Sequence, residues 1–314
     1  SDVGYSSEGI AMDTFVHRQS PDIAGAVDTS KERREGVSDN QIDWFQGAGD
    51  QGVMIGYACD ETKQLMPMPV VLANRIVREL SACRQSSYIQ GILPDGKAQV
   101  TVEYENGKPV RLDSVVVSCQ HTEDKNLKKL EAEIRKKVLL PALRLLPPDE
   151  DTKIFINPSG RFVCGGMDAD TGLTGRKLMV DSYGSMVPHG GGAFSGKDCS
   201  KVDRSATYMA RYIAKNIVAA GLASKCQVSL AYAIGVAQPV MVQVDTFGTG
   251  KVCADDCLEL AIPLVFGLTP KQIVDSLRLT RPIFRQTAAF GHFGRKEFPW
   301  ERTDKVEALR NAVI

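Results

Sequence analysis

The sequence predicts an α+β fold, in which small sheets are covered by helices. Alternating apolar and polar residues on both sides of Asn106-Gly107 are a strong signal for a β-hairpin. Apolar residues at helical spacing recur in separate stretches, among them 70–82 and the stretch from Asp203 or Arg204 to Ala220. Strand hairpins and helices thus come in two or three batches, which is typical of similar sheet-plus-helix units.

The composition limits the classes of protein that the chain can represent. Its 314 residues, 43% of them hydrophobic, suffice for two or three domains or one large α/β unit. Lys plus Arg and Asp plus Glu both number 38, so no net field attracts nucleic acid or an anionic membrane. The cysteines are scattered, which favours reduced thiols over a zinc site or disulfides. No apolar run approaches a membrane span and no signal peptide opens the chain, so we expect a cytoplasmic protein.

In the first half of the chain the expected elements follow a charged segment. Residues 15–45 lack apolar periodicity, and we expect either a solvated surface loop or a lid over a site. The motif GAGDQG then leads into VMIGYA, a short apolar run suited to a buried strand. The later elements are a helix opened by Pro67 or Pro69, the two hairpin strands, an amphipathic helix over 124–146, and a strand, turn and strand over 153–166.

In the second half helices and strands alternate. The helix that ends at Ala220 has Gly221 as its stop signal. The runs CQVSLAYAIG and PVMVQVDTFG read as strands. Two short helices follow, PKQIVDSLRL, opened by Pro270, and DKVEALRNAV at the end of the chain.

The stretch PHGGGAFSGKDCSKVDRS at 188–205 is a candidate phosphate cradle at the start of a helix. Its three consecutive glycines can adopt positive φ and let backbone N–H groups approach an anion. The helix start adds a partial positive charge, Lys197 and Lys201 add two ammonium groups, and Asp203 can hold Mg²⁺. The segment is not a Walker loop, since GKD replaces GK[ST]. A glycine-rich turn with solvated charges would explain this segment equally well when it is taken alone.

Two further clusters carry charge that suits a nucleotide. In PSGRFVCGGMDADTGLTGRK at 158–177, three cations flank a glycine-rich acidic turn, and Phe162 offers a face for a base, although such a residue in an apolar run is more often core. The other cluster, LPDGK at 93–97, reads alone as an ordinary turn. The four histidines show neither metal spacing nor a Ser or Cys partner, which argues against zinc chemistry and triad hydrolysis.

Taken together, these motifs resemble the S-adenosylmethionine synthetase family, also called methionine adenosyltransferase. The similarity runs from Gly4 to the C-terminus in the order of the family. The motifs that carry it are QSPDI, GAGDQG, GRF, GLTGRK, HGGGAFSGKD, KVDRS, YAIGVA and GHFGR. Of these, GAGDQG and GGGAFSGKD together are highly specific.

The resemblance implies three similar units around a pseudo-threefold axis, interleaved along the chain. Residues 1–33 and 166–203 would form a central unit, 40–60 and 204–314 a C-terminal unit, and 61–165 an N-terminal unit. A first part of the N-terminal region, with a GHPDK-like motif, is expected to be missing from the sequence. The loop at 28–41 would gate the site. The assembly would be a homodimer or a pair of dimers, with active sites between subunits and with no nucleic acid or membrane partner.

The resemblance also implies a reaction. ATP, L-methionine and water would give S-adenosylmethionine, phosphate and diphosphate, with Mg²⁺ and K⁺ required. The methionine sulfur attacks ribose C5′, and the tripolyphosphate is then hydrolysed. A thioether has no proton to lose, so catalysis would rest on alignment and on stabilising a charged leaving group, which explains the lack of a visible base.

Site residues follow from the resemblance position by position. It implies Lys197, Lys201, Arg176 and Asp50 as catalytic, and Asp203 as the Mg²⁺ ligand. It implies ATP contacts from Asp95, Lys97, Ser159, Gly160, Arg161, Phe162, Asp170, Arg176, Lys177, Ala193, Lys197 and Lys201. It implies methionine contacts from Gln19, Asp170 and Lys201.

Two alternatives to this enzyme remain open from the sequence. One is a catalytically impaired fragment or non-catalytic subunit that keeps the fold, although such a subunit has no use for a polycationic site. The other is a phosphohydrolase acting on tripolyphosphate, which would keep the cradle and need no methionine pocket.

Overall fold

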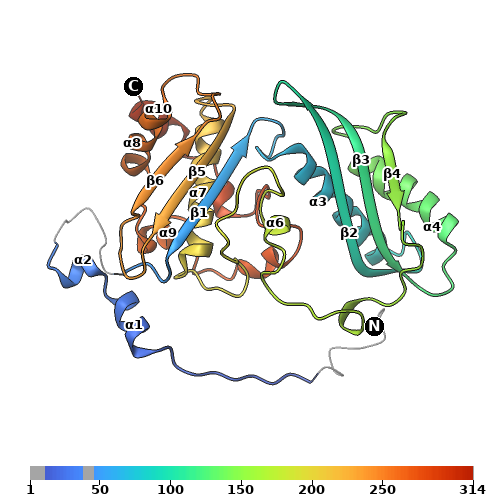
Figure 1. Cartoon of the computed structure of the whole chain (residues 1–314), viewed down its shortest axis with the longest axis horizontal. Coiled ribbons are helices and arrows are strands. Elements are labelled where there is room, and N and C mark those ends of the chain that lie inside the picture. Colours follow the sequence, from blue (N-terminus) through green and yellow to red (C-terminus); the bar gives the residue numbers. More distant parts are fainter. Residues whose placement is uncertain (1–10, 38–45, 314) are drawn as a thin grey trace. The chain divides into compact units, whose positions relative to one another are not determined.

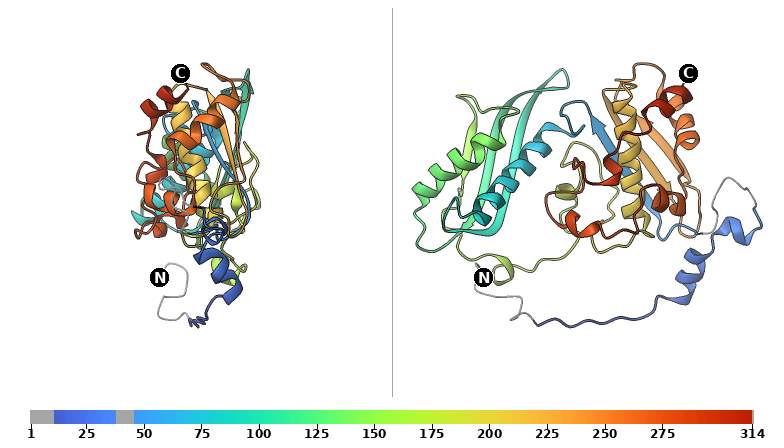
Figure 2. Two further views of the ribbon diagram at one scale, coloured as in Figure 1. Left: turned by 90° about the vertical axis from the view of Figure 1, so that its left-hand side faces the viewer. Right: turned by 180° about the vertical axis from the view of Figure 1, so that it is seen from behind.

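The computed structural model describes residues 11–37 and 46–313 and has the predicted mixed α+β character. The chain forms two compact units (Figures 1 and 2). Of the described residues, unit 1 contains Met68–Leu173 and residues 11–16, and unit 2 contains residues 17–37, 46–67 and 174–313. Within these ranges each unit has one three-stranded sheet. The division into three interleaved units stays a prediction.

Unit 1 is built on the predicted hairpin. Strands β2 (Ile92–Glu105) and β3 (Lys108–His121) are antiparallel, and β4 (Lys153–Ile156) pairs in parallel with β3. Asn106 and Gly107 both have positive φ, at 50° and 75°, as a two-residue hairpin turn of this twist requires. Helices α3 (Met68–Gln85) and α4 (Leu127–Ile134) lie on one face of the sheet (Figure 2). The core between them is apolar.

Two expectations for unit 1 were wrong in detail. The single helix predicted over 124–146 consists of α4, a π-helical turn at Arg135–Leu139 and a short α5 at Leu140–Ala142. Pro141 lies inside α5, where it cannot donate a backbone hydrogen bond, so the regular pattern ends there. The second strand predicted before residue 166 does not form, because Asn157 and Gly160 take positive φ, at 44° and 84°, and turn the chain.

Unit 2 is organised around one long helix. Strands β1 (Gly52–Cys59), β5 (Lys225–Tyr232) and β6 (Met241–Asp245) form an antiparallel sheet in the order β1-β5-β6. Helix α7 (Val202–Ala219) packs across this sheet (Figure 1), and Gly221, with φ 75°, follows it as predicted. A Cβ on Gly56 would lie 2.0 Å from the Ala210 carbonyl carbon, so the helix and β1 meet at backbone contact.

The remaining helices of unit 2 are short. The predicted helices are present as α9 (Pro270–Ser276) and α10 (Val306–Ala312). The sequence reasoning missed α8 (Asp255–Val265), whose interior Pro263 and exposed Leu260 and Leu264 obscure the amphipathic pattern. It also missed the short helical turns α6 (Leu178–Asp181), η4 (Phe284–Ala288) and η5 (Pro299–Glu301) of this unit, and η3 (Gly166–Asp168) of unit 1.

The charged N-terminal segment forms two short helices among its described residues, whereas residues 11–20 are extended and exposed. It forms α1 (Pro21–Asp28) and α2 (Lys31–Arg34), so the expectation of a loop throughout was wrong. The carboxylate of Glu32 accepts the backbone N–H of Ala237 at 3.0 Å, and the Lys31 N–H donates to the Gly235 carbonyl at 2.9 Å. Helices this short leave little periodicity to detect. Residues 38–41 of the predicted gate lie outside the described residues.

A buried ion cluster joins α7 to the C-terminal segment of unit 2. The guanidinium of Arg211 makes two bonds to the carboxylate of Glu301, at 2.8 and 3.1 Å, and Lys215 Nζ donates to the same carboxylate at 2.7 Å. The side chains of Arg211 and Glu301 are 0% exposed. Arg211 also donates to the carbonyl groups of Tyr57, Gln64 and Leu65. The cluster therefore satisfies its own charges inside the core.

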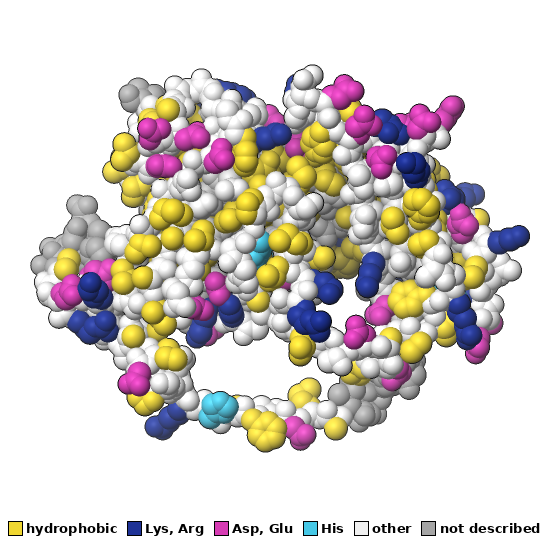
Figure 3. All heavy atoms as spheres, viewed as in Figure 1, with side chains coloured by type: hydrophobic (Ala, Val, Ile, Leu, Met, Phe, Trp, Pro, Cys, Tyr) yellow, Lys and Arg dark blue, Asp and Glu magenta, His cyan; other side chains and the backbone are white. Residues whose placement is uncertain are grey.

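Lys, Arg, Asp and Glu side chains are interspersed over the face shown in Figure 3, in keeping with the balanced composition. No single described helix is long and apolar enough to cross a membrane. Helices α8 and α9 pass that test only together, across a 75° bend.

Candidate active site

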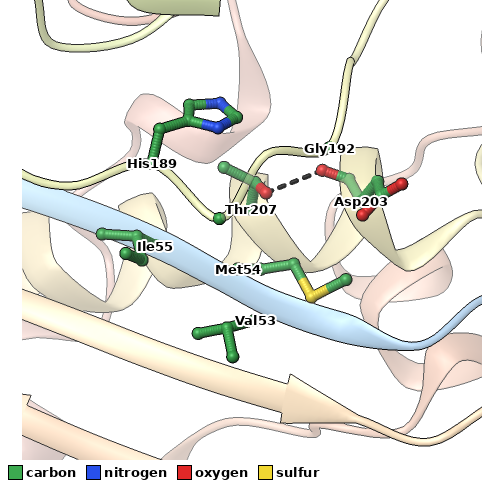
Figure 4. Close-up of a pocket in the computed structure, with 8 residues that line it drawn as sticks. Val53, Met54, Ile55, His189, Gly192, Asp203 and Thr207 are labelled. Atoms are coloured by element: carbon green, nitrogen blue, oxygen red, sulfur yellow. Dashed lines mark hydrogen bonds between the residues drawn. The ribbon is translucent and has the colours of Figure 1, made fainter.

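The glycine stretch lies between β1 and the first turn of α7 (Figure 4). A Cβ on Gly190 would lie 1.6 Å from the Val53 carbonyl oxygen, and one on Gly192 would lie 2.2 Å from Asp203 Oδ1. Gly191 has φ 94°, which side chains rarely adopt. The three glycines are thus required by close packing on the strand, by backbone conformation and by contact with Asp203.

We expect Gly190→Ala to destabilise unit 2 by about 1–3 kcal/mol, because the added methyl group forces the glycine stretch away from β1. Urea unfolding measures this loss. The matched control is Gly172→Ala, since nothing lies within 4 Å of the Cβ position of Gly172. Equal stability of the two variants would contradict the packing described here.

Two lysines and an aspartate that the sequence singled out lie together at the start of α7. Lys197 Nζ donates to Asp203 Oδ2, and Lys201 Nζ donates to Asp198 Oδ2 at 3.0 Å. Lys201 is the N-cap residue of α7 and makes no side-chain cap bond, and Asp203 lies in the first turn. The helix start therefore offers the partial positive charge of its backbone N–H groups beside two ammonium groups. This concentration of positive charge suits the binding of a phosphate chain.

A buried arginine that the sequence reasoning did not single out supports this cluster. Arg204 donates to the Lys197 carbonyl at 2.8 Å, to the Tyr208 hydroxyl at 3.0 Å and to Thr287 Oγ1 at 3.0 Å. Its guanidinium also stacks 3.7 Å from the Phe284 ring centre. The motif KVDRS contains this residue, yet its partner Thr287 lies 83 residues away, so only the fold reveals its function.

The histidine of GHFGR belongs to the same support. His292 Nδ1 lies 2.7 Å from the Tyr208 hydroxyl, and Nε2 lies 3.5 Å from Ser195 Oγ. Burial, together with the charges of Arg204 and Arg295, lowers the pKa of His292 to about 3. The imidazole is therefore neutral, and its approach of 3.9 Å to Asp181 is not an ion pair.

The remaining predicted residues of unit 2 lie near this cluster or on the surface. The GAGDQG segment that carries Asp50 packs on the cluster, because a Cβ on Gly49 would lie 2.7 Å from the Ser200 carbonyl oxygen. A Cβ on Gly175 would lie 2.5 Å from Ala193 Cβ, so the turn that carries Arg176 and Lys177 packs on Ala193. Arg176, Lys177 and Gln19 are exposed.

Unit 1 carries the other predicted ATP contacts. The expectation that LPDGK is a turn was wrong, because these residues lie in β2, where the register shifts between Ile92 and Gly96. Asp95 Oδ2 accepts the Gly166 N–H at 2.8 Å, and this bond ties β2 to the segment before Asp170. Lys97, Ser159, Arg161 and Asp170 are exposed, and Gly160 and Phe162 are half-buried.

The loop from Ser159 to Phe162 is held to the end of β3 by His121. The backbone N–H of His121 donates to the Phe162 carbonyl at 2.9 Å, and the backbone N–H of Phe162 donates to the ring nitrogen Nε2 of His121 at 3.1 Å. Since Nε2 accepts, the proton of this neutral ring is on Nδ1, which lies 2.8 Å from the Thr122 carbonyl. His121 is thus a buried structural residue. Arg161 pairs with Glu123 at 2.5 Å on the surface.

The sequence was compared with known proteins. Residues 45–162 match the family model of the S-adenosylmethionine synthetase central domain, and residues 164–302 match that of the S-adenosylmethionine synthetase C-terminal domain. The chain is similar to an S-adenosylmethionine synthase of Desulforudis audaxviator (strain MP104C), with 54% identity over 311 residues. This match covers 98% of the chain and 78% of the relative.

Proposed function

Because the chain belongs to the S-adenosylmethionine synthetase family, we propose that it forms S-adenosylmethionine, phosphate and diphosphate from ATP, L-methionine and water. The observation that carries this proposal is the cluster of Lys197, Lys201 and Asp203 at the uncapped start of α7, against three close-packed glycines. Such a cluster suits a highly charged leaving group.

The chemistry needs charge stabilisation and alignment more than proton transfer. The methionine sulfur attacks ribose C5′ and has no proton to lose, so Lys197, Lys201 and Arg176 act by neutralising the tripolyphosphate that leaves. The carboxylate of Asp50 would lie near the sulfonium product. Gln19, Asp170 and Lys201 would bind methionine.

The residues of the cluster fit a magnesium ion that is shared with substrate. Among the described residues no group of three or more His, Cys, Asp and Glu could hold a metal alone. Mg²⁺ is commonly bound by one or two carboxylates together with substrate phosphates and water, and Asp203 supplies one such carboxylate. When bound, the ion neutralises charge on the phosphate oxygens. We propose K⁺ as a second required ion.

We propose that residues of unit 1 contact ATP, namely Asp95, Lys97, Ser159, Gly160, Arg161, Phe162 and Asp170. The Asp95–Gly166 and His121–Phe162 bonds support this proposal, because they fix the backbone of these segments before ligand arrives. For unit 2 we propose ATP contacts from Arg176, Lys177, Ala193, Lys197 and Lys201.

The assembly would follow the family. We propose three similar units around a pseudo-threefold axis, a homodimer or a pair of dimers with active sites between subunits, and a cytoplasmic location.

The test is an assay of purified protein with ATP, L-methionine, Mg²⁺ and K⁺. Mass spectrometry measures S-adenosylmethionine, and a separate assay measures phosphate and diphosphate. We expect all three products in equal amounts. Hydrolysis of added tripolyphosphate without S-adenosylmethionine would identify a phosphohydrolase instead. A protein that forms neither product would be a non-catalytic member of the family.

We expect Asp203→Asn to raise the Mg²⁺ concentration needed for half-maximal activity at least about 10-fold, because an amide is a weaker ligand for a hard cation. A magnesium titration of initial rates measures the shift. Asp256→Asn is the matched control, since Asp256 is exposed and is likewise the second residue of a helix, α8. Equal magnesium dependence of the two variants would contradict the ligand role of Asp203.

A further inference from the structure

The carboxylate of Glu32 in α2 accepts hydrogen bonds from two consecutive backbone N–H groups. Oε1 accepts from Ala237 at 3.0 Å and from Gln238 at 3.3 Å, and Oε2 accepts from Ala237 at 3.0 Å. Hydrogen bonds to a charged acceptor are stronger than those between neutral groups. Ala237 is 0% exposed, so loss of the carboxylate would withdraw the acceptor from a buried donor. Glu32 therefore fixes the backbone of segment 235–238.

Helix α2 holds this carboxylate in place. The side chain of Ser30, which is 0% exposed, caps the helix by accepting the Arg33 N–H at 3.2 Å. The Lys31 N–H donates to the Gly235 carbonyl at 2.9 Å, so the helix itself is bonded to the same segment. Figure 1 shows α2 at the end of the unit 2 sheet where β1 begins and β5 ends. The backbone that carries Glu32 thus directs its carboxylate at the two donors.

Segment 235–238 is bonded in turn to the motif GAGDQG. The Ala48 N–H donates to the Val236 carbonyl at 2.9 Å, and the Gly235 N–H donates to the Ala48 carbonyl at 2.9 Å. Ala48 is 0% exposed, so these bonds lie in the interior, where a hydrogen bond is electrostatically stronger than in water. A shift of the segment would therefore shift this motif.

The motif also contacts the start of α7. A Cβ on Gly49 would lie 2.7 Å from the Ser200 carbonyl oxygen and 3.7 Å from Lys201 Cα. Asp50 is the next residue along the chain. Its position relative to the candidate phosphate site therefore depends on how the motif is held, and Glu32 supplies part of that hold.

We propose that Glu32 is a positioning residue for the reaction: through segment 235–238 it holds GAGDQG against the start of α7 and so sets the place of Asp50. This inference rests on the proposed function, in which the Asp50 carboxylate lies near the sulfonium product. The sulfur becomes positive as its bond to C5′ forms, and a carboxylate stabilises that charge best from a fixed position.

The phosphate end of the site has restraints of its own. Lys197 binds Asp203, and Arg204 binds the Lys197 carbonyl at 2.8 Å. These bonds do not pass through Glu32. Loss of the Glu32 carboxylate is therefore expected to impair S-adenosylmethionine formation more than tripolyphosphate hydrolysis.

The first experiment examines the hydrogen bonds of Glu32 directly, without activity. In hydrogen exchange followed by ¹H–¹⁵N NMR, the amides of Ala237 and Gln238 are expected to exchange at least about 10-fold faster in Glu32→Ala than in wild type. Glu35→Ala is the matched control, since Glu35 ends the same helix and pairs with Lys31 on the surface, and it is expected to leave both amides unchanged. Equal exchange in Glu32→Ala and wild type would overturn the proposal.

The second experiment tests the positioning role. Glu32→Ala is expected to lower the rate of S-adenosylmethionine formation about 10-fold and to leave hydrolysis of added tripolyphosphate within about twofold of wild type. Glu32→Gln, whose amide oxygen can still accept both N–H groups, is expected to recover most of the lost rate. Equal loss of both rates, or unchanged S-adenosylmethionine formation in Glu32→Ala, would overturn the positioning role.

Urea unfolding is measured on each variant, so that loss of folding is recognised. If Glu32→Ala does not fold, Glu32→Asp takes its place, because it keeps the charge on a side chain one methylene shorter. The same selective loss is expected from it, and equal loss of both rates would overturn the proposal.

The two proposals fail in different ways. If the wild-type protein forms no S-adenosylmethionine, the proposed function fails, while hydrogen exchange still decides whether Glu32 holds segment 235–238. If S-adenosylmethionine forms and Glu32→Ala shows no selective loss, only the inference about Glu32 fails.

Discussion

Lys197→Ala is expected to lower kcat by about 10²- to 10³-fold while leaving the free energy of unfolding nearly unchanged. The ammonium group lies at the uncapped start of α7, where the leaving phosphates would develop charge, and loss of one such group removes stabilisation of the transition state. The side chain is 29% exposed, so its removal opens no core cavity. Steady-state kinetics and urea unfolding, performed on the same preparation, measure the two quantities.

The control for Lys197→Ala is Lys108→Ala, which removes an exposed ammonium group at the start of β3. We expect wild-type kinetics from this variant. If Lys197→Ala retains kcat within twofold, or if it unfolds, the assignment of Lys197 to the phosphates loses its support. A rise in KM at unchanged kcat would assign Lys197 to ground-state binding instead.

Glu301→Gln is expected to lower the free energy of unfolding by about 3–5 kcal/mol, because removal of one partner leaves the buried charges of Arg211 and Lys215 without compensation. Thermal or urea unfolding of the variant measures this loss. Glu307→Gln is the matched control, since that carboxylate pairs with Arg310 on the surface, where ion pairs contribute little. A loss below about 1 kcal/mol would contradict the role of the buried cluster.

The same cluster predicts the sign of an acid effect. Arg211 and Lys215 hold the pKa of Glu301 below its ordinary value, against the opposing effect of burial. A carboxylate with a lowered pKa contributes stability that is fully present above its unfolded pKa, about 4.5, and is lost as pH falls toward the folded pKa. Stability measured from pH 6 downward should therefore decline below about pH 4.5, and Glu301→Gln should reduce the decline.

Local signals in the sequence predicted local structure well. The hairpin at Asn106-Gly107 and the end of α7 at Gly221 each depend on a few adjacent residues, and both are confirmed. Helix α8 was missed because Pro263 and two exposed leucines obscure its pattern. Helix α2 is held by hydrogen bonds to Gly235 and Ala237, about 200 positions away, which no local pattern reveals.

In the candidate site, too, residues close in sequence could be predicted and contacts between distant residues could not. Lys197, Lys201 and Asp203 are close in sequence, and the structure brings them together at one helix start. The roles of Arg204 and His292 could not be read from the sequence, because Thr287 lies 83 residues from Arg204, and Tyr208 and Ser195 lie 84 and 97 residues from His292. Glu301 and Arg211 are 90 residues apart, and in the sequence each looks like a surface residue. In the structure they form a buried ion pair.

Arg204 has a consequence for how this site can be redesigned. Its guanidinium donates a hydrogen bond to the main-chain carbonyl of Lys197 and not to the side chain of that residue. The buried Arg204 therefore fixes the position of the loop, whereas the side chain of Lys197 supplies the charge. Libraries that vary Lys197 and keep Arg204, Tyr208 and Thr287 should yield many folded proteins with altered turnover. Libraries that vary the interior trio should mostly yield inactive ones.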